Sequence, residues 1–132
     1  MIERYWNSVG GTLVEEFLLV AGAPRTARRL IDAVILPLGE ARRIDLRGRR
    51  AVVIAGQDVV LVQAKANRLG MSLLGQALFS RELIARLEPR SVRTVALCSA
   101  GDAVLEAIAT KFGIEVVVDA GVGLEPGDSR SG

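Results

Sequence analysis

Two short apolar segments, residues 30–36 and 58–67, constrain the fold of this chain more than any other feature of its sequence. Both are rich in Val, Leu and Ile, which favours β-strands, yet each carries polar side chains where a buried strand requires apolar ones. Asp32 lies inside the first segment, and Gln63 and Lys65 lie near the end of the second. Residues two apart in a strand share a face, so Gln63 and Lys65 are expected to project together. Because a buried polar group without partners is costly, these breaks mark the place where a functional site is expected.

The remaining pattern of apolar, capping and turn residues predicts a single α/β domain over residues 1–120 and a loose tail over residues 121–132. Hydrophobic spacing and helix caps predict three helices, at Trp6–Gly22 (clearest over Thr12–Ala21), at Ser72–Leu87, and from Asp102 to Lys111 or Phe112. Short apolar runs predict five strands, at residues 30–36, 51–55, 58–64, 92–98 and 114–118. The charged run 40–50 is expected to be a polar connection or a short hairpin.

The predicted order is α-β-β-β-α-β-α-β, which is typical of a mixed central sheet of about five strands flanked by helices. The first three strands are so closely spaced that they favour an antiparallel meander. The last two strands are separated by a helix, which indicates a right-handed parallel crossover.

The composition excludes several classes of active site. The 132 residues include no histidine and one cysteine, Cys98, which excludes His-dependent nucleophiles, His-ligated metals and Cys-based zinc sites. Any catalytic metal must therefore have oxygen ligands, which favours Mg²⁺ or Mn²⁺. No apolar run approaches the length of about eighteen residues that crosses a bilayer. Because the N-terminus also lacks the residue order of a signal peptide, we expect a soluble cytoplasmic protein.

Two further groups of charged residues stand near the apolar segments. Glu15 and Glu16 interrupt the predicted first helix, and at 100° per residue one of them must lie beside its core face. The sequence does not choose between them. Arg25, Arg28 and Arg29 directly precede the strand that contains Asp32, where they either contact phosphates or form a solvated loop.

The sequence has, in this order, a predicted helix that carries a glutamate, an aspartate in the first strand, Q-x-K at the end of the third strand and a helix after it. The order of these features resembles that of the PD-(D/E)XK nuclease superfamily. Its fold is also called restriction endonuclease-like. By this resemblance Asp32 matches the metal-binding aspartate, Gln63 the second acidic position and Lys65 the lysine of the motif. Glu15 or Glu16 matches the helical glutamate of many members. The resemblance covers about residues 12–87 and the strand that follows.

Two positions depart from the pattern of the superfamily. Ile31 precedes Asp32 where proline is common, and Gln63 replaces the usual Asp or Glu. The Mrr-like branch of restriction enzymes also carries Q-x-K, but the missing negative charge is expected to weaken divalent-ion binding. Gln76, in G-Q-A-L-F-S after the motif, loosely resembles the glutamine of the RecB-like branch.

The resemblance implies a metal-dependent phosphodiesterase, an endonuclease or exonuclease acting on DNA. The implied ligands of Mg²⁺ or Mn²⁺ are the Asp32 carboxylate, the Gln63 side-chain oxygen, the Ala64 carbonyl, and the carboxylate of Glu15 or Glu16. Lys65 is implied to orient the attacking water or to neutralise the transition state. Arg25, Arg28, Arg29 and Gln76 are the implied contacts to nucleic acid. Dimers are common in this superfamily, so a homodimer is an open alternative.

Two other functions compete with this one. The first is a catalytically degenerate nuclease fold that binds nucleic acid or a protein partner without cleavage, motivated by Gln63 and the arginine-rich loops. The second is a Rossmann-like binder of small molecules, motivated only by C-S-A-G-D between a strand and a helix, where the required G-x-G-x-x-G is absent. Cys98 in this segment is interpreted as a buried core thiol. Aromatic residues are few, so contacts with nucleic acid are expected to run mainly from arginine to phosphate.

Overall fold

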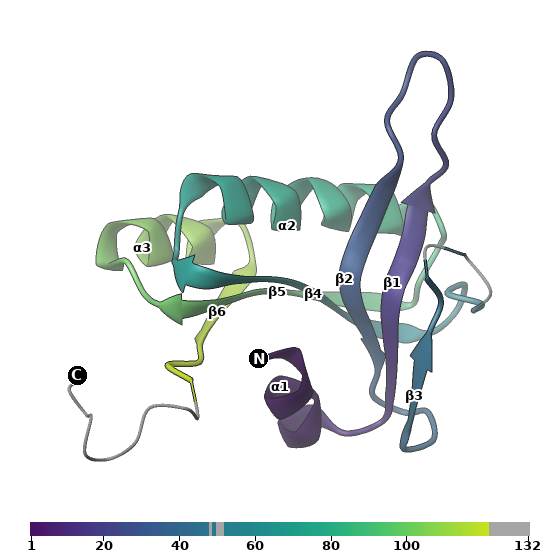
Figure 1. The fold of residues 1–132 in the computed structure, drawn as a ribbon, viewed down its shortest axis with the longest axis horizontal. Helices are drawn as coiled ribbons and strands as arrows, with labels where there is room; N and C mark the ends of the chain where they lie inside the picture. The colour runs from purple at the N-terminus through teal and green to yellow at the C-terminus, as the bar shows by residue number, and fades with distance from the viewer. Residues whose placement is uncertain (48, 50–51, 122–132) are drawn as a thin grey trace.

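A computed structural model describes residues 1–47, 49 and 52–121 of the chain (Figure 1). These residues form three helices and six strands. In chain order they are α1 (Ile2–Val9), β1 (Thr12–Val20), β2 (Arg29–Leu36), β3 (Arg42–Asp45), β4 (Asp58–Arg68), α2 (Met71–Ala85), β5 (Ser91–Ala100), α3 (Ala103–Lys111) and β6 (Ile114–Val118).

The six strands form one mixed sheet in the order β3-β1-β2-β4-β5-β6. The pairs β1/β2 and β2/β4 are antiparallel, so a meander exists, but its first strand is β1, and the predicted strand at 51–55 is not part of it. The pairs β4/β5 and β5/β6 are parallel, and each is joined by a helix, α2 or α3. Because β2 and β4 are neighbours, the two segments that carry Asp32 and Gln63 lie side by side at the centre of the sheet.

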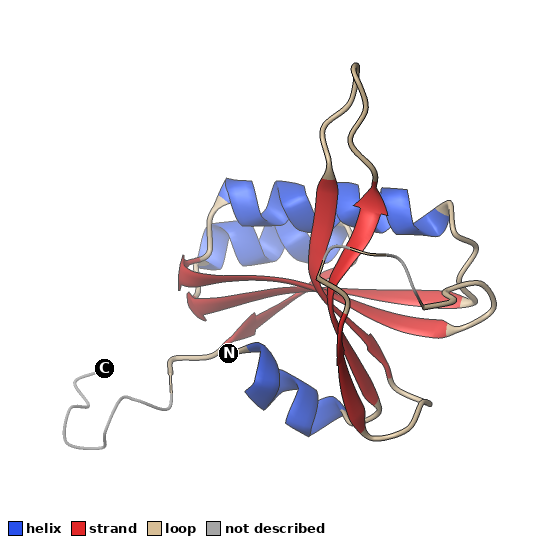
Figure 2. Ribbon diagram, turned by 45° about the vertical axis from the view of Figure 1, so that its right-hand side comes forward, coloured by secondary structure: helices blue, strands red, loops and turns tan. Residues whose placement is uncertain are grey.

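The molecule has three layers (Figures 1 and 2). Helices α2 and α3 cover one face of the sheet and α1 covers the other. On the α2 face, Phe17, Val34 and Leu61 pack with Ile84 of the helix. On the α1 face, a second cluster is formed by buried residues of the central strands and the apolar side of α1. The central strands are therefore buried on both faces, which explains their nearly continuous apolar sequence.

The first helix lies earlier in the chain than the sequence predicted. Ile2, Tyr5, Trp6 and Val9 follow the i, i+3, i+4, i+7 spacing of an amphipathic helix, and these side chains pack on the sheet. The helix ends at Gly10, whose φ of 85° is a conformation that glycine adopts without strain.

The prediction of a helix over Trp6–Gly22 is wrong, because residues 12–20 form strand β1. Leu13 packs on the α1 face and Val14 on the α2 face, as alternation in a strand requires. The all-round apolar pattern that suggested a buried helix is the pattern of a strand covered on both sides. Glu15 and Glu16 therefore lie on a strand, and no helix carries them.

Several smaller expectations also need correction. Residues 52–55 are not a strand, and residue 51 lies outside the described residues. Within the run 40–50, predicted as a polar connection or a short hairpin, Arg42–Asp45 forms strand β3, which pairs in parallel with β1 at one edge of the sheet; residues 48 and 50 lie outside the described residues. Of the predicted tail, only residue 121 is described. The other predicted strands and the last two helices are confirmed.

Candidate functional site

The strands β2 and β4 separate at Asp32, and side chains take over the hydrogen bonds there. Regular pairing ends at Ala33 and Val62. Beyond that point, the Asp32 N–H donates to Gln63 Oε1 over 3.3 Å, and the Ala64 N–H donates to Asp32 Oδ2 over 2.9 Å. The aspartate and the first two residues of Q-x-K are thus held together by two side chain–backbone hydrogen bonds.

Gln63 is buried on the α2 face of the sheet. It is 5% exposed, and its Nε2 donates to Ser80 Oγ of α2 over 2.8 Å. Since its Oε1 accepts from the Asp32 N–H, both ends of the amide have partners inside the protein. A buried amide with both ends satisfied is the arrangement in which a polar group is tolerated in a core. Gln63 thereby fixes the position of Asp32 relative to α2.

The other notable residue is Glu16, which lies directly opposite Asp32. The pairs Glu15↔Ala33 and Phe17↔Ile31 bracket this position in the antiparallel register. The φ of Glu16 is 55°, in the left-handed region that side chains other than glycine rarely adopt. Two carboxylates at opposed positions repel each other. Repulsion and backbone strain at one point of a sheet are features that concentrate at functional sites.

The left-handed residue changes which side chains face which layer. Val14 and Phe17 both pack on the α2 face although they are three residues apart, so the alternation of β1 shifts between them. Ile31 and Val34 show the same shift on β2. As a result, Glu15 and Glu16 border one cavity together with Asp32.

This acidic cavity has a volume of about 390 Å³ and lies between β1, β2, β3, β4 and the start of α1. Four carboxylates and one guanidinium line it: Glu15, Glu16, Asp32, Asp45 and Arg43. Ile2 and Ala64 complete the lining. Arg43 donates to both oxygens of Glu15, over 2.8 and 3.1 Å, and lies 3.5 Å from Glu3 of α1. The carboxylates outnumber the guanidinium, so the cavity favours cations.

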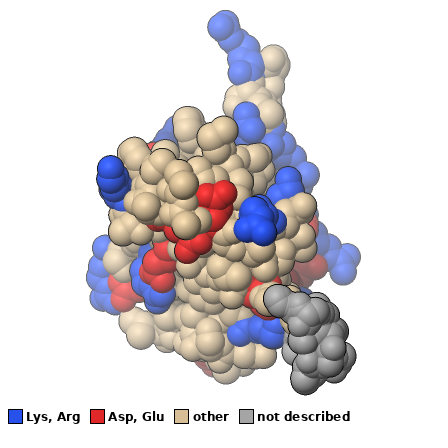
Figure 3. All heavy atoms as spheres, turned by 90° about the vertical axis from the view of Figure 1, so that its left-hand side faces the viewer, with Lys and Arg blue, Asp and Glu red and all other residues tan. Residues whose placement is uncertain are grey.

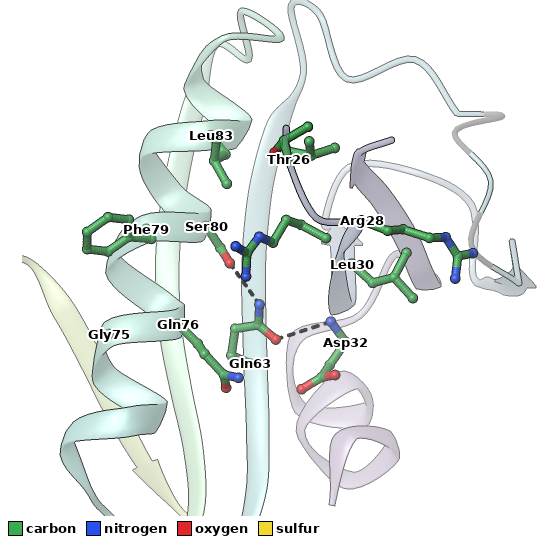
Figure 4. Close-up of a pocket in the computed structure, with 12 residues that line it drawn as sticks. Thr26, Arg28, Leu30, Asp32, Gln63, Gly75, Gln76, Phe79, Ser80 and Leu83 are labelled. Atoms are coloured by element: carbon green, nitrogen blue, oxygen red, sulfur yellow. Dashed lines mark hydrogen bonds between the residues drawn. The ribbon is translucent and has the colours of Figure 1, made fainter. Parts of the chain in front are cut away.

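A larger cavity of about 620 Å³ lies on the opposite side of Asp32, between α2 and the β1–β2 hairpin (Figure 4). Its polar lining residues are Thr26, Arg28, Arg29, Asp32, Gln63, Gln76 and Ser80, and its apolar ones are Val20, Leu30, Gly75, Phe79 and Leu83. Figure 4 shows Gln63 between Ser80 and Asp32, with dashed lines to both. Asp32 borders both cavities, and we call this one the hairpin cavity.

The structure thus divides the predicted site residues between the two cavities. The acidic cavity is bordered by Asp32, Ala64, Glu15 and Glu16. Both glutamates that the sequence left as alternatives therefore lie at the same cavity. Gln63 and Gln76 border the hairpin cavity instead. Lys65 is exposed on β4 and is outside the lining of both cavities as described.

The predicted arginines lie in and beside the loop of the β1–β2 hairpin, which projects from the body of the molecule (Figure 1). Arg25, Arg28 and Arg29 are all exposed. Figure 3 shows basic side chains along this projecting part. Arg28 and Arg29 also border the hairpin cavity, whereas Arg25 does not.

The donors around the acidic cavity match a hard cation in kind. Among the described residues, no group of three or more acidic or cysteine side chains is close enough to hold a metal ion. Mg²⁺ usually binds through one or two carboxylates, with water and substrate phosphate as its other ligands. Asp32 and Glu16, at opposed positions beside the Ala64 backbone, provide oxygen donors of that kind. Gln63 does not fit the predicted ligand set, because it borders the hairpin cavity and not the acidic one.

Four residues of this region were not among the predicted site residues. Ser80 holds Gln63, Arg43 holds Glu15, and Asp45 and Glu3 stand beside them. The spacing of α1 is a signal that identifies Glu3 as a helical glutamate. Arg43 and Asp45 come from a short edge strand in a charged run, which has no apolar alternation to reveal it.

The structure gives no support to a small-molecule site at C-S-A-G-D. Asp102 caps α3 by accepting from the N–H groups of Val104 and Leu105, over 3.1 and 3.0 Å. The Glu106 carboxylate accepts from the Asp102 N–H and fills the space before Gly101, where an added Cβ would meet it at 2.3 Å. Two carboxylates at this helix end disfavour an anion. Cys98 is fully buried, and burial raises the pKa of its thiol.

Comparisons of this chain with protein-family models, with curated proteins and with solved structures found no match. None of the helices in the described residues is both long and apolar enough to span a membrane. DNA and a homodimer as partners stay predictions.

Proposed function

We propose that this protein is a metal-dependent nuclease of the PD-(D/E)XK type that acts on DNA. The observation that carries the proposal is the hydrogen bond from the Ala64 N–H to Asp32 Oδ2, beside the carboxylates of Glu15 and Glu16. It brings the early aspartate to the middle residue of Q-x-K, at the border of a cavity that favours cations.

The arrangement of elements also supports this proposal. The chain begins with helix α1, which is followed by the antiparallel meander β1, β2 and β4. Helix α2 and the parallel strand β5 come next. A restriction endonuclease-like fold requires this order, with β3, α3 and β6 as additions. In this reading Glu3 on α1 takes the place of the helical glutamate, and Arg43 links it to Glu15.

Each group has a defined task in such a reaction. Asp32 and Glu16 would hold Mg²⁺, with the Ala64 carbonyl as a further oxygen donor. When bound, the ion supplies stabilisation of the charge that develops on the phosphate and lowers the pKa of a water molecule. Arg28 and Arg29, which border the hairpin cavity, neutralise the phosphates of the substrate and hold the DNA strand in place. Lys65 provides a compact positive charge two residues beyond Gln63.

The test is a cleavage assay on plasmid and linear DNA with Mg²⁺ or Mn²⁺. Asp32→Asn keeps an oxygen acceptor for the Ala64 N–H but removes the charge, and Lys65→Gln removes the other charge. We expect the wild type to cleave and both variants to lose at least about a hundredfold in rate, as removal of a transition-state contact does. Lys111→Gln alters the only other lysine, on α3, and serves as the matched control. Equally intact DNA with wild type and variants would reject the proposal.

One observation favours the second candidate, a nuclease fold that binds DNA without cleaving it. Gln63 is neutral and both of its ends are engaged, so the second acidic position contributes nothing to a metal site. In Gln63→Glu, the carboxylate still accepts from the Asp32 N–H and from the Ser80 hydroxyl. Salt-sensitive DNA binding without cleavage, by the wild type and by Gln63→Glu alike, identifies this candidate, because residue 63 borders the hairpin cavity and not the acidic one.

A further inference from the structure

The hairpin cavity has the size and lining of a site for one nucleotide. Its volume of about 620 Å³ falls within the range of small-molecule sites, which is roughly 300–1,000 Å³. One part of its wall is apolar, with Val20, Leu30 and Leu83, and another part carries amide and hydroxyl groups. A base requires the first kind of surface, and a sugar and a phosphate require the second.

Cations lie where a phosphate would enter. Arg28 and Arg29 border the cavity at the base of the hairpin, and both are exposed. Among the described residues no carboxylate forms an ion pair with Arg29. Its guanidinium therefore carries a net charge that an anionic ligand would compensate. Arg25 lies in the same loop but outside the lining, so the chain itself provides a matched control.

The floor of the cavity leads directly to the acidic site. Gln63 and Asp32 form part of this floor, and Asp32 also borders the acidic cavity on its other side. A nucleotide in the hairpin cavity would therefore place its linking phosphate beside the Asp32 carboxylate. The two cavities would therefore hold consecutive parts of one DNA strand, the nucleotide in the hairpin cavity and its linking phosphate at the acidic one.

The geometry points to the hairpin cavity as a binding site for a single unpaired nucleotide next to the phosphodiester at Asp32. This inference rests on the proposed function and specifies its substrate class. A base within a duplex is stacked on both faces and paired at its edge, so it reaches such a cavity only when it is unpaired or flipped out. The preferred substrate is accordingly a single strand or a frayed strand end.

Gly75 provides a direct way to close this site. It lies on α2 in the cavity lining, and a Cβ added there meets no atom within 4 Å. Gly75→Leu adds a side chain to the cavity lining from a Cβ position that is free of clashes, and leucine improves the helix propensity of α2, so the variant is expected to fold. Gly75→Ala is the smaller step of the same series.

The experiment measures the fluorescence anisotropy of a labelled single-stranded oligonucleotide and of its blunt duplex, in EDTA, over a series of salt concentrations. We expect the single strand to bind more tightly. Gly75→Leu should weaken its binding by at least about fivefold, the loss of one stacked base, with Gly75→Ala in between and the duplex within about twofold. Arg29→Gln should lower the slope of log affinity against log salt concentration by about one. Arg25→Gln should leave single-strand affinity within about twofold.

Equal binding of both DNA forms, or single-strand affinity unchanged in Gly75→Leu, overturns the inference. Because EDTA removes the metal, this result is independent of cleavage. Cleavage activity that Gly75→Leu leaves intact on single strands would reject the nucleotide site and keep the nuclease. Selective binding that depends on Gly75 and Arg29, in a chain that cleaves no DNA, would keep the site and reject the nuclease.

Discussion

Replacement of Gln63 by leucine tests whether the buried amide holds the two central strands and α2 together. Leucine has nearly the same size but offers no hydrogen bond. The Asp32 N–H then loses its acceptor at 3.3 Å, and the hydroxyl of Ser80, a residue that is 7% exposed, loses its donor at 2.8 Å. Each polar group left without a partner costs about 1–3 kcal/mol.

The lower end of that range applies here for two reasons. Gln63 and Ser80 border the hairpin cavity, so water reaches the groups that lose their partner. The leucine side chain also gains from burial. We therefore expect Gln63→Leu to lower the free energy of unfolding by about 2 kcal/mol, which corresponds to about 8 °C in Tm for a domain of this size.

Urea denaturation followed by the fluorescence of Trp6, the only tryptophan, measures this change. Gln76→Leu is the matched control, because Gln76 is exposed on the same cavity, and its effect should stay within about 0.5 kcal/mol. The double variant Gln63→Leu/Ser80→Ala should lose less free energy of unfolding than the sum of the single variants, since Ser80→Ala removes one of the two polar groups that Gln63→Leu leaves without a partner. A Gln63→Leu protein as stable as the wild type would refute the role assigned to this amide.

Two more predictions concern charged groups. Arg43→Gln should strengthen Mn²⁺ binding several-fold in calorimetry, because it frees the Glu15 carboxylate and removes the guanidinium that lines the acidic cavity. The control is Arg42→Gln, on the same strand but outside the lining, which should leave Mn²⁺ binding unchanged. The Arg90 guanidinium and the Ser91 hydroxyl, at 2.7 Å, lower the pKa of Asp58 from 3.8 to about 2. Because the pKa of Asp58 is lower in the folded than in the unfolded protein, its ionised carboxylate stabilises the folded state above about pH 4, and this stabilisation is lost as the pH falls through about 2. Asp58→Asn should therefore be less stable at pH 7 in urea titrations, with the difference vanishing toward pH 2, and a constant difference would contradict this.

The central part of the fold was predictable because local pattern and tertiary environment agree there. The segments that became β2, β4, β5 and β6 are short, rich in Val, Leu or Ile and bounded by turns, so they have one interpretation. The helices α2 and α3 carry clear ends, with Pro89 after the first and an Asp102 cap before the second. In these elements packing only reinforces what the local sequence prefers.

The N-terminal part was not predictable, because its pattern is ambiguous without its partners. A nine-residue segment in which two glutamates interrupt apolar residues that face both layers has no clear period to distinguish a strand from a helix. The left-handed Glu16 is invisible in sequence, since a glutamate rarely adopts that conformation. The position of Arg43 depends on β3 pairing with β1, which is a long-range event that no local signal records.

The candidate site illustrates why the residue types of a motif are easier to predict than their directions. Asp32 and Gln63 were expected to meet, and they are hydrogen-bonded. The resemblance implied that Gln63 would be a metal ligand together with Asp32, but the two strands separate at Asp32, and Gln63 borders the hairpin cavity instead of the acidic one. A neutral residue at this position is consistent with that geometry, because a carboxylate there would lie next to a second acidic residue, Asp32. The amide thus has a structural task, since it joins Asp32 to Ser80 through two hydrogen bonds, whereas an acid at residue 63 would perform the same task with an added negative charge beside Asp32.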